Sequence, residues 1–181
     1  EVVADRLIFR ARTDATGFEL WTSDGTESGT QIIGDMSPGP TSTDIQSHVV
    51  AADKYFFYGR TLPTDVGYEL YAYDGNSTYV VKDIIADTIN APAISYLTAA
   101  CGGVFFQASD GVHGSELWFS NGTANGTFMA ADLVPGAPSS SPSELAPYSG
   151  GLFFAAEDQV HGREPWGCSC ALVGIEEALG G

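Results

Sequence analysis

Acidic residues recur at regular intervals along this chain, and their carboxylates are its first candidates for chemistry. Four glutamates are spaced by 50, 47 and 48 residues: Glu19, Glu69, Glu116 and Glu164. Four aspartates lie shortly before them: Asp14, Asp65, Asp110 and Asp158. Oxygen-rich loops can bind Ca²⁺, which takes about six to eight oxygen ligands, so the sequence predicts Ca²⁺ as a candidate cofactor at Asp14, Asp110 and Asp158. The alternative, which we favour, is that each Asp caps a turn and each Glu satisfies a backbone or cross-strand partner.

Two histidines belong to the same pattern. Asp110-x-x-His113-x-x-Glu116 and Asp158-x-x-His161-x-x-Glu164 match residue for residue. A transition-metal site would require these side chains to converge, which we do not expect of a loop that enters a strand. We interpret both as surface-loop histidines, and His48 as a structural residue.

Aromatic residues form a third column, two positions after each glutamate. Its members are Trp21, Tyr71, Trp118 and Trp166. Flat aromatic faces could stack on sugar rings, but bulky residues at a fixed position of a repeat usually fill the core between sheets. We therefore interpret the aromatic column and the glutamate column as structural.

The three cysteines, Cys101, Cys168 and Cys170, cannot all pair within one chain. A bridge between Cys168 and Cys170 would span a single residue and strain the disulfide geometry. Cys101 paired with either of the other two is the bridge expected in an oxidising compartment, and three free thiols are the alternative. A zinc site would have too few ligands.

Glycosylation sequons occur at Asn76, Asn121 and Asn125. In a eukaryotic secreted protein these asparagines would be candidate glycan sites on exposed hairpin tips. Because Asn also suits tight turns, two of the sequons could reflect turn formation alone.

The sequence assembles no catalytic centre. The serines at positions 139–141 lie in a Pro-rich loop without the Gly-x-Ser-x-Gly elbow of hydrolases. A net charge of −16, with 7 Lys and Arg among 181 residues, excludes the basic patch that nucleic-acid binding requires. No apolar run is long enough for a membrane-spanning helix. We predict that the chain is not an enzyme, with a propeller-type hydrolase as the alternative.

The three columns belong to a repeat of about 48 residues. Apolar pairs mark each copy: Ile8-Phe9, Phe56-Phe57, Phe105-Phe106 and Phe153-Phe154. The units cover roughly residues 5–52, 53–101, 102–149 and 150–181, and residues 1–4 match the end of a preceding or closing strand. Each unit predicts four short strands, because apolar runs are separated by Asp-Gly or Asn-Gly turns. In the first unit the strands are expected at 7–12, around 19–23, at 31–35 and at 46–51.

Four strands in about 48 residues is the size of one β-propeller blade. The predicted fold is therefore all-β and propeller-type, with three whole units plus one split or partial unit, and a β-solenoid is the runner-up. Circular propellers often complete a sheet at one end of the chain with a strand from the other end. A closed four-bladed ring is one possibility, and a piece of a larger propeller and an open array are the others.

The repeat resembles the ELWxxDGT repeat family. The first copy carries Glu19-Leu20-Trp21, Asp24-Gly25-Thr26, Gly29-Thr30, Asp35 and Pro38-Gly39, and the third carries Glu116-Leu117-Trp118, Asn121-Gly122-Thr123, Gly126-Thr127, Asp132 and Pro135-Gly136. The second copy has Tyr71 in place of Trp, and the fourth has Pro165 in place of Leu. The resemblance implies propeller-like repeats of large secreted or cell-surface proteins, with no assigned catalytic residues.

From these observations we expect a non-catalytic extracellular scaffold, structural or adhesive, that mediates association with a protein partner or with itself. A calcium-dependent carbohydrate-binding module, with glycans as partners, is the alternative. Neither a nucleic-acid partner nor a transmembrane segment is expected, and the expected location is outside the cell or on its surface.

Overall fold

The computed structural model describes residues 1–60, 67–85, 94–171 and 174–177. Within these ranges every regular element is a β-strand, which confirms the all-β prediction. The same residues contain no helix that is long and apolar enough to cross a membrane.

The strands form four antiparallel sheets, each built from four consecutive strands. The first sheet contains β1 (Val2–Val3), β2 (Arg6–Thr13), β3 (Gly17–Ser23) and β4 (Gln31–Ile32), and the second contains β5 (Asp44–Ala51), β6 (Lys54–Arg60), β7 (Glu69–Tyr73) and β8 (Thr78–Lys82). The third contains β9 (Ser95–Ala100), β10 (Gly103–Ala108), β11 (Glu116–Ser120) and β12 (Thr127–Ala131), and the fourth contains β13 (Ser143–Tyr148), β14 (Gly151–Asp158), β15 (Gly162–Ser169) and β16 (Gly174–Glu177).

The sheets are out of phase with the sequence repeat by one strand. Two-residue turns at Ala4-Asp5 and Ala52-Asp53, with φ between 48° and 59°, close tight hairpins between the first two strands of a sheet. β1 therefore pairs with β2, the next strand in the sequence, with Val2 opposite Leu7. It does not pair with a strand from the other end of the chain. The expectation of one unit split between the two ends is wrong, because each sheet is continuous in sequence.

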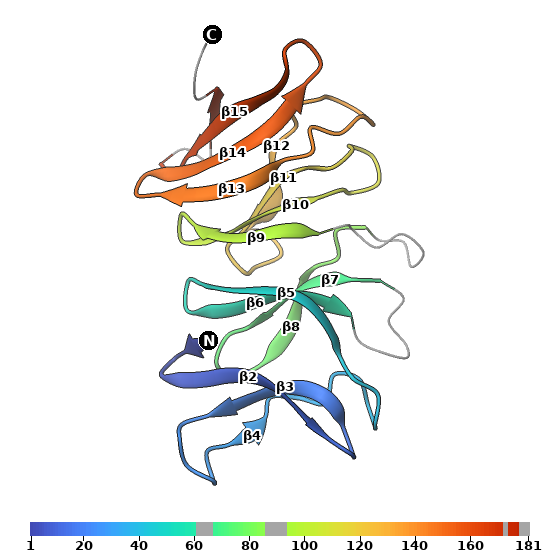
Figure 1. The fold of residues 1–181 in the computed structure, drawn as a ribbon, viewed down its shortest axis with the longest axis vertical. Coiled ribbons are helices and arrows are strands. Elements are labelled where there is room, and N and C mark those ends of the chain that lie inside the picture. Colours follow the sequence, from blue (N-terminus) through green and yellow to red (C-terminus); the bar gives the residue numbers. More distant parts are fainter. Residues whose placement is uncertain (61–66, 86–93, 172–173, 178–181) are drawn as a thin grey trace.

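The sheets stack face to face in one row, with the first sheet at one end and the fourth at the other (Figure 1). The sheets of the described residues do not close into a ring, so the closed four-bladed ring is not formed, while a piece of a larger propeller and an open array stay predictions. The first strands of the second, third and fourth sheets, β5, β9 and β13, lie beside one another along the row.

The apolar pairs of the second and third sheets pack against the sheets on both sides. Side chains of successive strand residues point to opposite faces, so Phe56 packs toward the third sheet while Phe57 packs toward the first. Both rings are 0% exposed. Because full burial of a Phe side chain contributes roughly 1.5–3 kcal/mol, these pairs account for much of the cohesion between sheets.

Candidate functional site

Glu19 on β3 is fully buried and holds the loop that leads into the second sheet. Its Oε1 accepts a hydrogen bond from the backbone N–H of Thr43 at 3.0 Å. Its Oε2 accepts hydrogen bonds from the Thr43 hydroxyl at 2.6 Å and from the Met36 N–H at 3.3 Å. Since Thr43 immediately precedes β5, the carboxylate ties the first sheet to the start of the second.

Glu116 on β11 repeats this arrangement in the third sheet. Its Oε1 accepts from the Ser140 N–H at 2.8 Å, and its Oε2 accepts from the Leu133 N–H at 3.2 Å and from the Ser140 hydroxyl. As in the first sheet, the hydroxyl residue lies 24 positions after the glutamate. We call this set of contacts between a buried glutamate and the following loop the glutamate clamp.

Two residues before each clamp, a glycine lets the same loop approach the strand. A Cβ built on Gly17 would lie 2.7 Å from the Pro40 carbonyl oxygen, and one on Gly114 would lie 2.3 Å from that of Pro138. The Ser139 hydroxyl accepts from the Ser115 N–H at 2.8 Å. The serines at positions 139–141 therefore help to fasten the loop to the strand.

The electrostatics of the clamps agree with a structural role. Burial raises the pKa of Glu19 and of Glu116, while hydrogen bonds from Thr43 and Ser140 oppose that rise. A carboxyl group with a raised pKa can act as a general acid. Both glutamates are 0% exposed, however, and their oxygens are occupied by the loop, so neither reaches a substrate in this structure.

For the other two glutamates of the column, the residues that would complete a clamp are not among those described. Glu69 on β7 is half-buried, and the positions that would correspond to Thr43 and Ser140 fall outside the described residues, as does Asp65. Glu164 on β15 is also half-buried, and no hydrogen bond reaches its carboxylate from the part of the chain that the structure describes. Among the described residues the clamp is thus seen at Glu19 and at Glu116.

The Asp-Gly-Thr segments form hydrogen-bonded hairpin tips. Asp24 Oδ1 accepts from the N–H and the hydroxyl of Thr26, at 2.9 and 2.7 Å, and the Thr26 hydroxyl accepts from the Gly29 N–H. These contacts lower the pKa of Asp24. Asn121 Oδ1 accepts from Thr123 in the same way, at 3.0 and 2.8 Å. Asp and Asn can both form this turn because its hydrogen bonds use one acceptor oxygen, while Asp24 Oδ2 also lies 3.7 Å from the Arg6 guanidinium.

The sequons lie on these tips. Asn121 and Asn125 are exposed. The sequon of Asn125 ends at Thr127, whose buried hydroxyl lies 2.7 Å from the Ser120 hydroxyl. Asn76 is exposed and donates its backbone N–H to the Asp74 carboxylate. Turn formation accounts for these residue types, and glycosylation stays a prediction.

The matching Asp-x-x-His segments also form turns. Asp110 Oδ1 accepts from the backbone N–H groups of Val112 and His113, and its Oδ2 lies 2.8 Å from His113 Nδ1. Burial alone would raise the pKa of Asp110, but the hydrogen bonds from His113 outweigh it, and the pKa of Asp110 is lowered. The Asp110 carboxylate in turn raises the pKa of His113. In the fourth sheet, hydrogen bonds from His161 lower the pKa of Asp158 to about 2.

The three predicted calcium ligands are not brought together. Asp14 is fully exposed, 4.0 Å from the Arg12 guanidinium, and lies in the first sheet's hairpin loop. Asp110 and Asp158 belong to the third and fourth sheets. Among the described residues there is no group of three or more His, Cys, Asp or Glu side chains that could hold a metal ion. Ca²⁺ binding stays a prediction.

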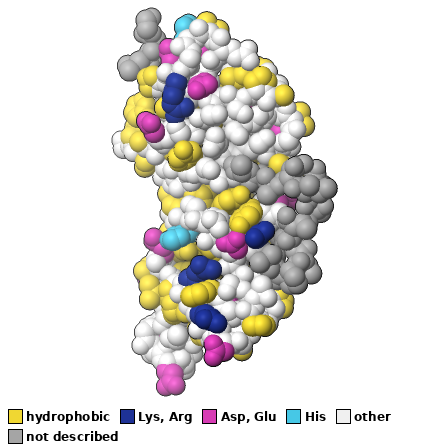
Figure 2. Space-filling view, turned by 45° about the vertical axis from the view of Figure 1, so that its right-hand side comes forward, with side chains coloured by type: hydrophobic (Ala, Val, Ile, Leu, Met, Phe, Trp, Pro, Cys, Tyr) yellow, Lys and Arg dark blue, Asp and Glu magenta, His cyan; other side chains and the backbone are white. Residues whose placement is uncertain are grey.

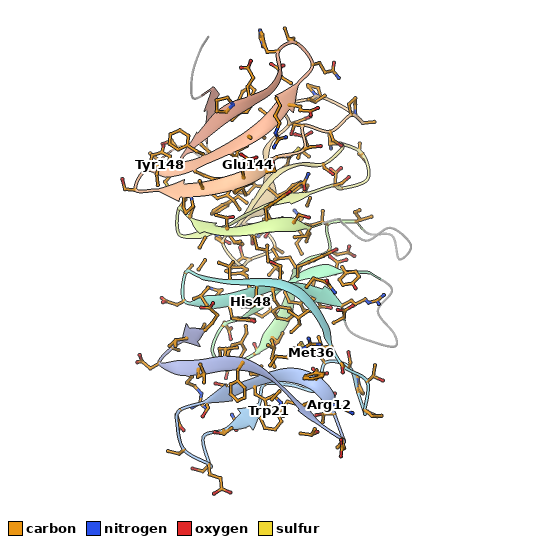
Figure 3. All side chains as sticks on the ribbon, in the orientation of Figure 1. Arg12, Trp21, Met36, His48, Glu144 and Tyr148 are labelled. Carbon is orange, nitrogen blue, oxygen red and sulfur yellow. A yellow bond between two sulfur atoms is a disulfide. The ribbon has the colours of Figure 1, made fainter. Side chains whose placement is uncertain are left out.

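The aromatic column lies between sheets at three of its four positions. Tyr71 and Trp118 are each 5% exposed and belong to inter-sheet cores, and Trp166 packs against the core between the third and fourth sheets. Trp21 occupies the outward face of the first sheet, and His48 lies on the neighbouring sheet (Figure 3).

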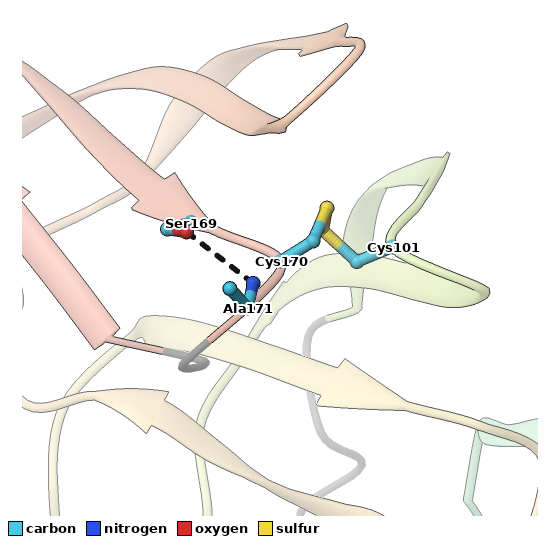
Figure 4. Close-up of a disulfide and its surroundings, with 4 residues drawn as sticks. All are labelled: Cys101, Ser169, Cys170 and Ala171. Atoms are coloured by element: carbon cyan, nitrogen blue, oxygen red, sulfur yellow. Dashed lines mark hydrogen bonds between the residues drawn. A yellow bond between two sulfur atoms is a disulfide. The ribbon is translucent and has the colours of Figure 1, made fainter.

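A disulfide joins Cys101 to Cys170, one of the two pairings that the sequence left open. It links the turn between β9 and β10 to the turn after β15, and so connects the third sheet to the fourth (Figure 4). Cys168 is a buried free thiol in the core between these sheets, where burial raises its pKa.

Sequence reasoning missed a cavity of about 320 Å³ between the first two sheets, lined among others by Glu1, Arg10, His48 and Tyr55. His48 stacks on Tyr55 with ring centroids 5.2 Å apart, and burial raises the pKa of Tyr55 to about 12. Figure 2 shows basic, acidic and histidine side chains gathered near the middle of one face, among hydrophobic ones. No sequence signal marked this cavity, because its charged residues do not recur between repeats.

No family model and no curated protein matches the chain. The chain is similar to a crystal structure of puromycin hydrolase, with a TM-score of 0.59 and 15% identity, over 98% of this chain and 27% of that one. A mutant of that enzyme complexed with PGG gives a TM-score of 0.54 and 14% identity, over 95% of this chain and 26% of that one. The chain thus spans about a quarter of those proteins, and the likeness is one of fold. The resemblance to the ELWxxDGT family stays a prediction.

Proposed function

We propose that this chain is a non-catalytic extracellular scaffold of propeller-type sheets that mediates association with proteins or with itself. One observation carries the proposal: the repeated carboxylates are used by the fold. Glu19 and Glu116 clamp loops, while Asp24, Asp110 and Asp158 accept hydrogen bonds within their own turns. Side chains committed to such contacts stabilise a framework and are not free to act on a substrate.

The propeller-type arrangement has support from the packing. In a propeller, small antiparallel sheets pack face to face and their first strands gather around an axis. Here four such sheets stack with β5, β9 and β13 side by side. The fold likeness to part of puromycin hydrolase agrees with this description.

The scaffold would present rigid turns to a partner. The hairpin tips at Asp24-Gly25-Thr26 and Asn121-Gly122-Thr123 are fastened by their own side chains, and most of their residues are exposed. Preorganised loops lose little conformational entropy on binding, which suits a display surface. An extracellular location is supported by the Cys101–Cys170 bridge, since disulfides persist in oxidising compartments.

A turnover assay tests this proposal against the propeller-type hydrolase. The purified chain is incubated with panels of ester, amide and glycoside substrates, beside the folded variants Glu116→Gln and Asp110→Asn. We expect no turnover above buffer from any of the three proteins. Turnover by the wild type that either variant loses, while its melting temperature is retained, would overturn the scaffold proposal.

A further inference from the structure

The hairpin tip between β11 and β12 contains two Asn-Gly sequences with different surroundings. They are Asn121-Gly122 and Asn125-Gly126. In an Asn-Gly sequence the backbone nitrogen of the glycine can attack the side-chain carbonyl carbon of the asparagine, because glycine has no Cβ to hinder the approach. The reaction removes the side-chain amide. Whether it takes place in a folded protein depends on how firmly the structure holds the asparagine side chain.

The side chain of Asn121 is held in place within the tip. Its Oδ1 accepts hydrogen bonds from the Thr123 N–H at 3.0 Å and from the Thr123 hydroxyl at 2.8 Å. The same amide lies against Gly126, where it occupies the space that a Cβ would take. Gly122, whose nitrogen would have to attack, is buried. To react, the amide of Asn121 must leave both hydrogen bonds and turn toward a buried nitrogen.

Asn125 lacks this restraint. It is exposed, and no residue in the described part of the chain forms a hydrogen bond with its side chain. The two attacking nitrogens are matched, since the Gly122 N–H donates to the Ser120 hydroxyl and the Gly126 N–H donates to the Thr123 hydroxyl, both at 3.0 Å. The difference between the two sequences therefore lies in the asparagine side chains and in the burial of the glycine.

We propose that Asn125 is a site of spontaneous deamidation, at which the folded chain acquires aspartate and isoaspartate, while Asn121 in the same tip is protected. The Gly126 nitrogen forms a bond to Asn125 Cγ, the bond between Cγ and Nδ2 breaks, and the side-chain nitrogen leaves as ammonia with the proton that Gly126 loses. Water then opens the five-membered imide ring. Opening at one carbonyl gives aspartate, and opening at the other gives isoaspartate. Water is the only co-reactant, so no catalytic centre is required.

The isoaspartate form would disturb the contact of the tip with the second sheet. The Gly126 carbonyl accepts from the Asn121 N–H at 3.2 Å, and the Thr127 carbonyl accepts from Lys82 Nζ on β8 at 2.8 Å. Isoaspartate routes the backbone through the side chain and so lengthens it directly before Gly126, which displaces both acceptors. Deamidation thus adds a negative charge to the tip and weakens its attachment. This inference does not depend on the scaffold function.

A time course of peptide mapping tests the proposal. The full chain, produced without glycosylation, is incubated in warm, mildly alkaline buffer, and the same chain unfolded in guanidinium chloride is the reference. Mass spectrometry measures asparagine, aspartate and isoaspartate at both positions. We expect similar rates at the two asparagines in the unfolded chain. In the folded chain Asn125 should react roughly tenfold faster than Asn121 or more, because two hydrogen bonds must first break at Asn121.

The first sheet supplies the matched control. Ser28 occupies the position in its tip that corresponds to Asn125, and Gly29 corresponds to Gly126. Asn125→Ser should therefore keep the melting temperature of the wild type and form no isoaspartate at position 125.

Equal rates at the two asparagines of the folded chain, whether fast or slow, would overturn the proposal. Its structural consequence is tested by comparing the purified isoaspartate form with Asn125→Asp, which adds the charge without lengthening the backbone. A melting temperature that is lower for the isoaspartate form alone supports a displaced tip, and equal melting temperatures would overturn that consequence. None of these results bears on turnover, so failure of this inference is separate from failure of the scaffold function.

Discussion

The third and fourth repeats carry the same Asp-x-x-His-x-x-Glu sequence, and its glutamate has different surroundings among the described residues. Glu116 is fully buried and clamps the loop that leads into the next sheet. Glu164 is half-buried, and the position 24 residues after it would be 188, past residue 181 of the sequence, so its counterpart of Ser140 is not among the described residues. By contrast, the turns at Asp110–His113 and Asp158–His161 form the same hydrogen bonds in both repeats. Contacts within a turn follow the motif itself, whereas the clamp depends on a segment 24 residues away.

The fourth sheet is attached to the third sheet by a disulfide as well as by packing. The Cys101–Cys170 bridge fastens its β15 end to the third sheet. Clamp and disulfide are thus two ways to fix neighbouring sheets, and each can be removed separately.

Removing the bridge should have the largest effect. The cysteines are separated by 69 residues, and the chain-entropy model assigns a loop of that length about 4 kcal/mol. The double variant Cys101→Ala/Cys170→Ala should lose about that much unfolding free energy in urea titrations. Cys168→Ala is the control that keeps the bridge. A reducing agent that leaves the wild-type midpoint unchanged would contradict this expectation.

Breaking the clamp should come next. Glu116→Ala leaves the N–H groups of Leu133 and Ser140 and the Ser140 hydroxyl without their acceptor, which should cost about 3 kcal/mol. Glu164→Ala should change stability by less than about 0.5 kcal/mol. Urea unfolding of both variants gives the comparison directly, and equal losses would mean that the hydrogen bonds to Glu116 do not stabilise the chain.

The clamp should also have a characteristic pH dependence. Burial raises the pKa of Glu116, so its contribution to stability is fully present below the ordinary Glu pKa and is lost as pH rises through the raised value. The stability of wild type relative to Glu116→Gln should therefore decrease from acid toward neutral pH. Urea unfolding across that range measures it, and a flat difference would mean that the pKa is unshifted.

The smallest effect should come from the turn. Because the pKa of Asp158 is lowered to about 2, its contribution is present above the ordinary Asp pKa and disappears as pH falls through about 2. Asp158→Asn should abolish that part of the acid dependence and lower stability slightly at neutral pH, because the amide oxygen can keep the backbone hydrogen bonds of the turn but not the charge beside His161. An NMR titration of the carboxyl group gives the pKa itself; a value near that of an exposed Asp would count against the turn contacts.

Much of the local structure could be predicted from the repeat. The strand around residues 7–12 is β2, and the expected strand at 46–51 lies within β5. The Asp-Gly-Thr and Asp-x-x-His segments form the expected turns. The clamps could not be predicted, because a glutamate on a strand does not indicate which distant N–H groups it will meet. Gly17 and Gly114 stand two residues before Glu19 and Glu116, where the loop leaves no room for a Cβ. Gly162 stands at the same spacing before Glu164 with nothing within 4 Å of a Cβ built on it, so the glycine alone does not mark a clamp.

The sequence by itself determined the strands, the turns and the alternation that sends Phe56 and Phe57 to opposite faces, because these depend on neighbours within a few residues. Only the tertiary structure decided which strands share a sheet, which cysteine joins Cys101, and that the sheets of the described residues do not close into a ring. Those outcomes depend on contacts between segments far apart in sequence. A regular repeat offers several equivalent partners for each segment, so three-dimensional packing is needed to choose among them.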